Sequence, residues 1–282
     1  MSVVLFLFLL SMAAAVLFPL ILTLAGSFMS ESEISFHYGK LLYGDRPSSG
    51  ATAVKLIPEL VTLEQYSTVL FQSPEYLLKF WNSLFYTVPI TFFQVVIALF
   101  ASYSFSRFPS KAKSLLLFLY TVLMLMPYQV TMVPNYIMAD RFNLIDTRWS
   151  IWLPGIVAPF SVYLLTKFMR KIPMSVYEAA KVDGANEWQI CTKISIPLAK
   201  SAAVSVIILV FIDYWNMVEQ PVLMLSDLEL HPLSVYLAKI NAQEIGVAFA
   251  VAVVYMVIPI LIFLYGEDYL VEGIIYSGSV KG

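Results

Sequence analysis

Long uncharged apolar runs constrain this chain more than any other feature of its sequence. A helix needs about 20 mostly apolar residues to cross the hydrocarbon core of a bilayer. Lipid offers no partner to free backbone N–H and C=O groups, so each such run must be helical. The runs predict an all-α polytopic membrane protein, a single transmembrane domain over 1–282 with six transmembrane helices. The predicted spans are approximately 3–25, 81–103, 114–136, 149–167, 201–218 and 246–266.

Composition excludes several other classes of protein. Hydrophobic residues make up 60% of the chain and charged residues 13%, against about 25% charged residues in soluble domains. The net charge of −2 gives no basic surface for nucleic acid. Cys191 is the only cysteine, and His37 and His231 lie far apart. The sequence therefore predicts no disulfide framework, no metal site and no cofactor.

The first apolar run is too long for the h-region of a signal peptide, and no basic segment precedes it. We expect it to be a retained helix. Lysine and arginine favour cytoplasmic loops, and they gather after the second and fourth predicted spans. This bias predicts that both termini are cytoplasmic, that the loop 31–79 faces outward and that the loop 170–199 lies in the cytoplasm.

The loop 170–199 is too long to be a simple connector, and its first part carries helix signals. Ser175 and Glu178 have the spacing of a capping box. Gly184 suits the left-handed residue that ends a helix. Val176, Tyr177 and Ala180 would form an apolar face of the kind that seats in a groove of a partner. We therefore predict a short helix ending before Gly184.

The second part of the loop predicts another short helix. Asn186 and Gln189 can open it, and Pro197 marks a break before the fifth span. The whole loop therefore reads as a helix-turn-helix held beneath the membrane.

The spacing of this loop resembles the EAA motif of binding-protein-dependent ABC importer permeases. The matching residues are Glu178, Ala179, Ala180, Gly184, Ile194, Ile196 and Pro197. The family usually has leucine where this chain has Ile196. Segments 101–108, 126–136 and 273–282 are similar to sequences in permeases of the carbohydrate, MalG-like type.

This resemblance implies a fold and a set of partners. It implies the type I permease fold of ABC importers, in a bacterial inner membrane. It also implies a second permease subunit of different sequence, two cytoplasmic ATPase subunits and an extracytoplasmic solute-binding protein. The ATPase-coupling residues would be Tyr177, Glu178, Ala179, Ala180, Asp183, Gly184, Ile194 and Pro197. The chain lacks a G-x-x-x-x-G-K-[ST] phosphate loop, so a partner would hydrolyse ATP and this chain is not expected to be an enzyme.

Asp213 lies inside the fifth predicted span, where an ionisable residue suggests function. A carbohydrate path needs hydrogen-bonding groups and aromatic faces. Candidate pathway residues are Asp213, Trp215, Asn216, Gln129 and Asn135, with Tyr136 as a second aromatic face. The alternative is that Asp213 is only hydrated near the outer interface, or bonds a neighbouring helix.

Other functions stay open at this point. The chain could be a permease for another small solute, such as an amino acid or a peptide, since the EAA loop is shared across importers. An ATPase-independent secondary transporter or channel would explain six spans and Asp213, but not the cytoplasmic motif. A membrane enzyme is disfavoured because the sequence has no H-E-x-x-H and no G-x-S-x-G motif. Copurification with an ATPase would distinguish an ABC permease from an ATPase-independent transporter or channel.

Overall fold

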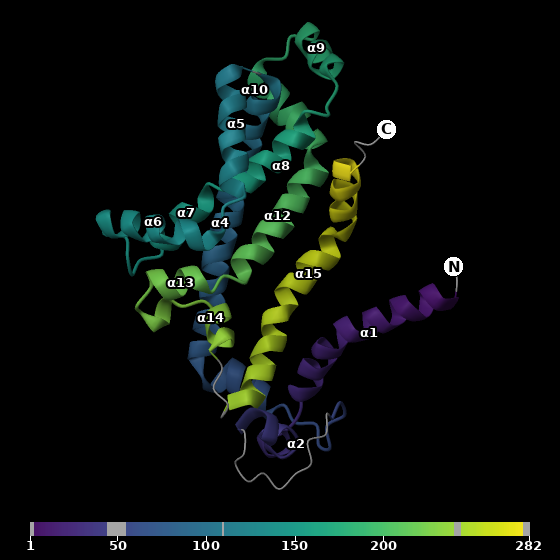
Figure 1. Cartoon of the computed structure of the whole chain (residues 1–282), viewed down its shortest axis with the longest axis vertical. Helices are drawn as coiled ribbons and strands as arrows, with labels where there is room; N and C mark the ends of the chain where they lie inside the picture. Colours follow the sequence, from purple (N-terminus) through teal and green to yellow (C-terminus); the bar gives the residue numbers. More distant parts are fainter. Residues whose placement is uncertain (1–2, 44–54, 109, 240–243, 279–282) are drawn as a thin grey trace. The chain divides into compact units, whose positions relative to one another are not determined.

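Helices are the regular secondary structure of the described part of the chain. The computed structural model describes residues 3–43, 55–108, 110–239 and 244–278, and all regular elements in these ranges are helices (Figure 1). Four helical stretches are long and apolar enough to cross a membrane: Val3–Gly26, Pro74–Arg107, Trp149–Met169 and Ile245–Leu270. The number rises to six if each of two bent helix pairs counts as one span. The all-α prediction is confirmed, and the span count lies between four and six.

Four of the predicted spans correspond to continuous helices. These are α1 (Val3–Gly26), α4 (Pro74–Arg107), α12 (Lys200–Trp215) and α15 (Ile245–Gly278). The helices α4 and α15 extend well beyond the predicted 81–103 and 246–266. The helices continue into turns that contain polar residues. The predicted spans were bounded by apolar runs and therefore stop short of these turns.

The third predicted span, 114–136, is not a straight helix. It consists of α5 (Lys111–Met124) and α6 (Tyr128–Arg141), whose axes are bent by 105°. Pro127 lies at the break with an extended backbone, φ −58° and ψ 144°. A proline disfavours helical backbone in the residue before it and cannot donate its own N–H, so the helix ends here and a new one begins.

The fourth predicted span also contains a break. Helix α7 (Trp149–Ile156) is followed by the extended Val157 and then by α8 (Pro159–Met169). Pro159 occupies the first turn of α8. The N–H groups of a first turn have no acceptor within the helix, so the missing N–H of proline costs no hydrogen bond there.

The chain divides into two compact units, described here separately. Met1–Trp81 with Pro232–Ile258 form the first, and Asn82–His231 with Pro259–Gly282 form the second. In the first unit, the segment predicted as an outer loop contains α2 (Glu31–Tyr43), α3 (Glu64–Ser67) and a π-helical turn at Thr68–Gln72. Helix α14 (Leu233–Ala238) belongs to the same unit. The core of this unit comprises Met29, Ile34, Tyr38 and Ile245.

The core of the second unit is made where α4, α8 and α12 pack together. It contains many small side chains; its buried members are Val95, Ala98, Val162, Leu165, Ala202, Ala203, Val206 and Val210. Small residues let helix backbones approach closely, which is how helices associate in membranes. Helices α9 (Met174–Val182) and α10 (Glu187–Ile190) lie at one end of this unit and α13 (Glu219–Met224) at the other (Figure 1).

Buried polar groups add hydrogen bonds between α4 and α8. The Gln94 Nε2 donates to Ser161 Oγ at 2.6 Å, and the Ser102 hydroxyl donates to the carbonyl of Val162 at 2.9 Å. Because both bonds are sequestered from water, they fix the register between the two helices.

Gly155 lies at the meeting point of α7, α4 and α12. A Cβ placed there would come within 3.0 Å of Ile90 and 3.1 Å of Tyr214. We expect Gly155→Leu to destabilise the purified protein by roughly 1–3 kcal/mol through overpacking, measured as a lower thermal unfolding midpoint in detergent. Ala112→Leu, on an exposed position of α5, is the control and should leave the midpoint unchanged. An unaltered midpoint for Gly155→Leu would contradict this packing.

Candidate functional site

The turn after α9 has the geometry expected from Gly184. This glycine has φ +78°, and its N–H bonds the carbonyl of Lys181 at 3.0 Å. The N–H of Ala185 bonds the carbonyl of Ala180, also at 3.0 Å. These two bonds define a Schellman motif with glycine at the left-handed position. The predicted left-handed stop is confirmed.

The start of α9 differs from the prediction. The helix begins at Met174 after Pro173, and no side chain caps it. Ser175 therefore lies inside the first turn, and the predicted capping box with Glu178 is wrong. The φ of −58° at Pro173 sets the entry angle of the helix before Ser175 can act as a cap. The Glu178 carboxylate is consequently not used for capping.

The second helix of the loop begins as predicted. The Asn186 side chain accepts from the N–H of Gln189 at 2.9 Å, and the Gln189 side chain accepts from the N–H of Asn186 at 3.0 Å. This is a complete capping box. It opens α10 in a well-defined direction directly after the Gly184 turn.

The predicted break at Pro197 falls two residues later. After α10 the chain makes a π-helical turn at Cys191–Ser195 and a short α11 (Ile196–Leu198), and the 72° bend to α12 follows at Ala199. The wide turn lies where the ring of Pro197 would meet the carbonyl four residues earlier. The wider π-helical turn accommodates the ring of Pro197, so the helix continues past this residue.

Two of the predicted coupling residues face inward. Tyr177 is 4% exposed, and Ala180 is buried beside it. They pack against Tyr103, Met169, Ile190, Cys191 and Ala199, with Ile194 half-buried at the edge of the cluster. The Ser195 hydroxyl lies 3.1 Å from that of Tyr177, and the Arg107 guanidinium sits 4.8 Å from the Tyr177 ring centre. The prediction that Tyr177 and Ala180 form a docking face is therefore wrong, because these two residues hold α9 to its own chain. Val176, the third residue of that face, is half-buried.

The opposite side of α9 is exposed. Ser175, Glu178, Ala179 and Val182 are exposed, and Val182 is 88% exposed. Their spacing of i, i+3, i+4 and i+7 puts them on one side of the helix. We call these four residues the outer stripe. Asp183 and Gly184, which directly follow Val182, are also exposed, and so is Pro197 in α11 (Ile196–Leu198).

Glu187 ties the loop together and escaped the sequence reasoning. Its Oε2 accepts a hydrogen bond from the Tyr103 hydroxyl of α4 at 2.6 Å. Its Oε1 lies 2.7 Å from the Nζ of Lys181 on α9. One carboxylate thus links three helices. The only sequence signal was its position directly after the Asn186 cap. An acidic residue in the first turn of a helix is favoured by the helix dipole, and this signal does not predict a link to other helices.

We expect loss of this link to loosen α9. Glu187→Ala removes two charge-assisted contacts, each worth about 1.5–3 kcal/mol when buried. The ion pair is worth less here, because the side chains of Lys181 and Glu187 are 49% and 41% exposed. Amide hydrogen exchange of peptides covering α9 should accelerate roughly fivefold, with Glu187→Gln between wild type and alanine. Glu267→Ala, at an exposed acid of the same unit, should not change it. Equal exchange in Glu187→Ala and wild type would contradict the role of the link.

A cavity of about 580 Å³ opens at the far end of α12. It is bounded by the start of α6, the end of α12, the link that follows it and the start of α13. Its lining residues are Tyr128, Ile212, Asp213, Tyr214, Asn216, Met217, Val218, Glu219 and Gln220. All of them belong to the second unit.

The cavity brings together some of the predicted pathway residues. Asp213 and Asn216 line it. Gln129 reaches it indirectly, because its Nε2 donates to both carboxylate oxygens of Glu219, at 3.1 and 3.2 Å. Asn135 is half-buried on α6 and Tyr136 is exposed there, and neither lines the cavity.

Trp215 is the exception among the predicted pathway residues. It is fully buried, with its ring stacked on Phe211 at a centroid distance of 5.5 Å and an interplanar angle of 17°. It is therefore a core residue and offers no face to a solute. Its neighbour Tyr214 and the more distant Tyr128 supply the aromatic rings of the cavity instead. The sequence of α12 does not show that the start of α6 lies beside the cavity.

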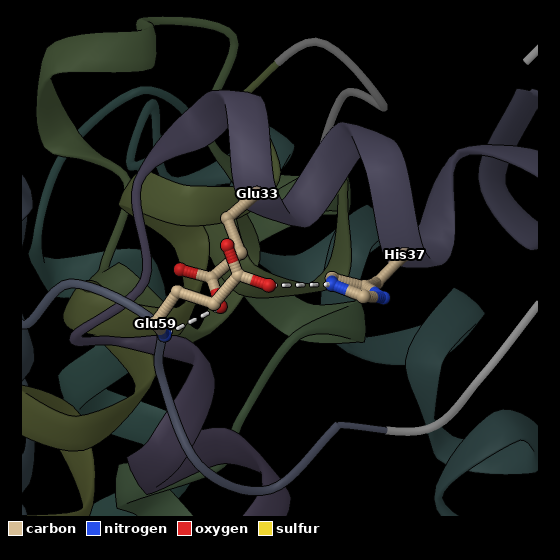
Figure 2. Close-up of side chains that lie close together, drawn as sticks. All are labelled: Glu33, His37 and Glu59. Carbon is tan, nitrogen blue, oxygen red and sulfur yellow. Dashed lines mark hydrogen bonds and ion pairs between the residues drawn. The ribbon is translucent and has the colours of Figure 1, made fainter. Parts of the chain in front are cut away.

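A cluster in the first unit gathers potential metal ligands. Ligand atoms of Glu33, His37 and Glu59 lie within 4.8 Å of one another (Figure 2). The ammonium of Lys55 lies 3.3 Å from Glu33 and 2.5 Å from Glu59, and its hydrogen bond lowers the pKa of the Glu59 carboxyl. The Glu59 N–H also donates to Glu33 at 2.9 Å. Since Lys55 already supplies the positive charge, we interpret the cluster as a clamp that holds the segment around Glu59 to α2.

Apolar helices long enough to cross a membrane, together with a helix-turn-helix at one end of α12 and a cavity lined by two carboxylates at the other, are the features expected of a membrane transport subunit. The chain belongs to the family described as binding-protein-dependent transport system inner membrane component, whose pattern matches residues 94–271. This assignment places it in an inner membrane and makes it a transport component rather than an ATPase. The loop and the cavity both fall within the matched residues.

Relatives of this chain are permeases. It is 31% identical over 208 residues to the osmoprotective compounds uptake permease protein GgtD of Synechocystis sp., covering 72% of this chain and 70% of the relative. It is 31% identical over 236 residues to the alpha-glucoside transport system permease protein AglG of Rhizobium meliloti, covering 80% and 62%. A solved bacterial ABC transporter that imports the acidic polysaccharide alginate matches with a TM-score of 0.79 at 23% identity, over 95% of each chain. That likeness establishes the fold.

Proposed function

We propose that this chain is a permease subunit of an ABC importer, that it forms half of the translocation pathway for a carbohydrate, and that cytoplasmic ATPase subunits drive it through the EAA loop. A second permease subunit would complete the pathway. A solute-binding protein outside the membrane would deliver the solute; the family description supports this part of the proposal by naming transport that depends on a binding protein.

The observation that carries this proposal is the direct connection between loop and cavity. Helix α12 begins at Lys200, immediately after the bend that ends the loop, and its last residues line the cavity. Its 16 residues span roughly 24 Å at 1.5 Å per residue. A displacement of the loop by an ATPase would therefore reach the cavity through one stiff element.

The outer stripe supports the coupling half of the proposal. A short helix with exposed residues at i, i+3, i+4 and i+7 is a known form of recognition in a groove. Behind it, Tyr177 and Ala180 are packed in the buried cluster with Tyr103 and Met169. One face of α9 is packed against its own chain and the opposite face is exposed. A movement of a partner bound to the exposed face would therefore be transmitted to the rest of the chain with little deformation of α9. In this arrangement Glu178 and Ala179 contact the ATPase, while Tyr177 and Ala180 hold α9 in place.

The carbohydrate half rests on relatives and on the chemistry of the cavity. Relatives are described as permeases for alpha-glucosides and for arabinooligosaccharides. Tyrosine rings beside carboxylate and amide groups suit a hydroxyl-rich solute, since aromatic faces contact the ring hydrogens and the polar groups bond the hydroxyls.

The orientation follows from charge. The basic residues around the EAA loop favour the cytoplasm, so we place this loop and both termini there. The residues between α1 and α4 would then face outward, toward the binding protein.

Purification through a tag on this chain tests the proposal. We expect an ATPase subunit and a second permease to copurify, and uptake of a sugar into proteoliposomes with the binding protein to require ATP and to stop with vanadate. ATP-independent uptake would favour a secondary transporter. ATP-dependent uptake of an amino acid or a peptide, with no uptake of sugars, would favour the other importer class.

A further inference from the structure

The cavity at the end of α12 carries negative charge without a matching cation. Asp213 and Glu219 both line it, and its lining residues include no lysine and no arginine. Within the described part of the chain, no basic side chain forms an ion pair with either carboxylate. Glu219 is held instead by the uncharged amide of Gln129. Both charges therefore act on whatever occupies the cavity.

The other polar groups of the cavity are neutral. The Tyr128 hydroxyl is buried and has no hydrogen-bond partner among the described residues. Asn216 is exposed, and Gln220 bonds backbone carbonyls of Ser150 and Ile151 through its Nε2. A ligand rich in hydroxyls can donate hydrogen bonds to the two carboxylates, both of which are exposed. A ligand carboxylate would add a third negative charge beside these two, and like charges at short distance repel.

We propose that this half of the pathway is built for an uncharged, hydroxyl-rich solute and rejects anionic sugars such as uronates. The inference rests on the proposed function and narrows it. It separates this chain from the solved relative that imports an acidic polysaccharide, although the two share a fold. Asp213 and Glu219 are the residues that set the charge preference, by repelling anions and by accepting hydrogen bonds from hydroxyl groups.

The charge of the cavity can be measured without knowing the solute. Asn216→Cys in a Cys191→Ser background places one thiol on the cavity lining of the full importer in membranes. Its reaction rates are compared for cationic trimethylammonioethyl and anionic sulfonatoethyl methanethiosulfonates. We expect the ratio of cationic to anionic rate to exceed that of a free thiol at least tenfold, because a negative cavity concentrates cations. Adding Asp213→Asn and Glu219→Gln, which keep shape and remove charge, should reduce this excess at least fivefold.

Three results would overturn the inference: a rate ratio equal to that of a free thiol, a ratio unchanged by neutralising both acids, or no reaction with either reagent. The solute itself gives a second readout, by mass spectrometry of the molecule carried by the copurifying binding protein. An uncharged sugar or polyol supports the inference. A uronate overturns it while leaving the proposed carbohydrate function intact, and an amino acid or a peptide overturns both.

Discussion

Gly184→Val should reduce ATP-dependent uptake at least tenfold while the protein still folds and inserts. Gly184 has φ +78°, a conformation that costs an L-residue roughly 1–2 kcal/mol and a β-branched residue more. A Cβ there would meet nothing within 4 Å, so the effect arises from the backbone and not from a clash. Valine would open the turn, break the bond from Ala185 to Ala180 and move α9 relative to α10.

Asparagine at the same position is the matched control. It also adds a side chain but tolerates the left-handed conformation, so Gly184→Asn should keep at least half of the uptake. If asparagine abolishes uptake as fully as valine does, a partner must contact the surface at residue 184 and the turn is not the cause. Normal uptake by Gly184→Val would contradict the requirement for a rigid turn.

Ala179→Arg should release the ATPase subunits from the purified complex and lower uptake at least tenfold. Ala179 is exposed in the centre of the outer stripe. A small residue at the centre of a helix seated in a groove permits close approach, and arginine would hold the two surfaces apart. Since the side chain points away from the core formed by Tyr177 and Ala180, the thermal unfolding midpoint of the isolated subunit should not fall.

The measurement is the ratio of ATPase to permease after affinity purification, with ATP-dependent uptake beside it. Ala179→Ser keeps the small size and should retain both. An Ala179→Arg complex with its full complement of ATPase would refute docking on the outer stripe, even if uptake were low for another reason.

Local signals in the sequence were sufficient where a single residue type dictates the backbone. Gly184 stops α9, and Asn186 with Gln189 opens α10, because each makes its bond within a few residues. The capping box at Ser175 failed because Pro173 set the start of the helix two residues earlier. A competing local signal of this kind is hard to rank from sequence alone.

Features that depend on which faces meet were not accessible in this way. A helical pattern identified Tyr177 and Ala180 as an apolar face but could not say that α4 and α10 would cover it. Trp215 was predicted to offer an aromatic face to a solute and is a core residue. Tyr128 lines the cavity because the third predicted span bends at Pro127.

The sequence by itself determined an all-helical membrane protein with an EAA loop, because apolar length and short-range spacing are properties of the chain read in order. The tertiary structure decided which side of α9 is exposed, that Glu187 joins three helices, and that Asp213 and Glu219 share one cavity. These are distances between residues separated along the chain, and the packing of helices sets them.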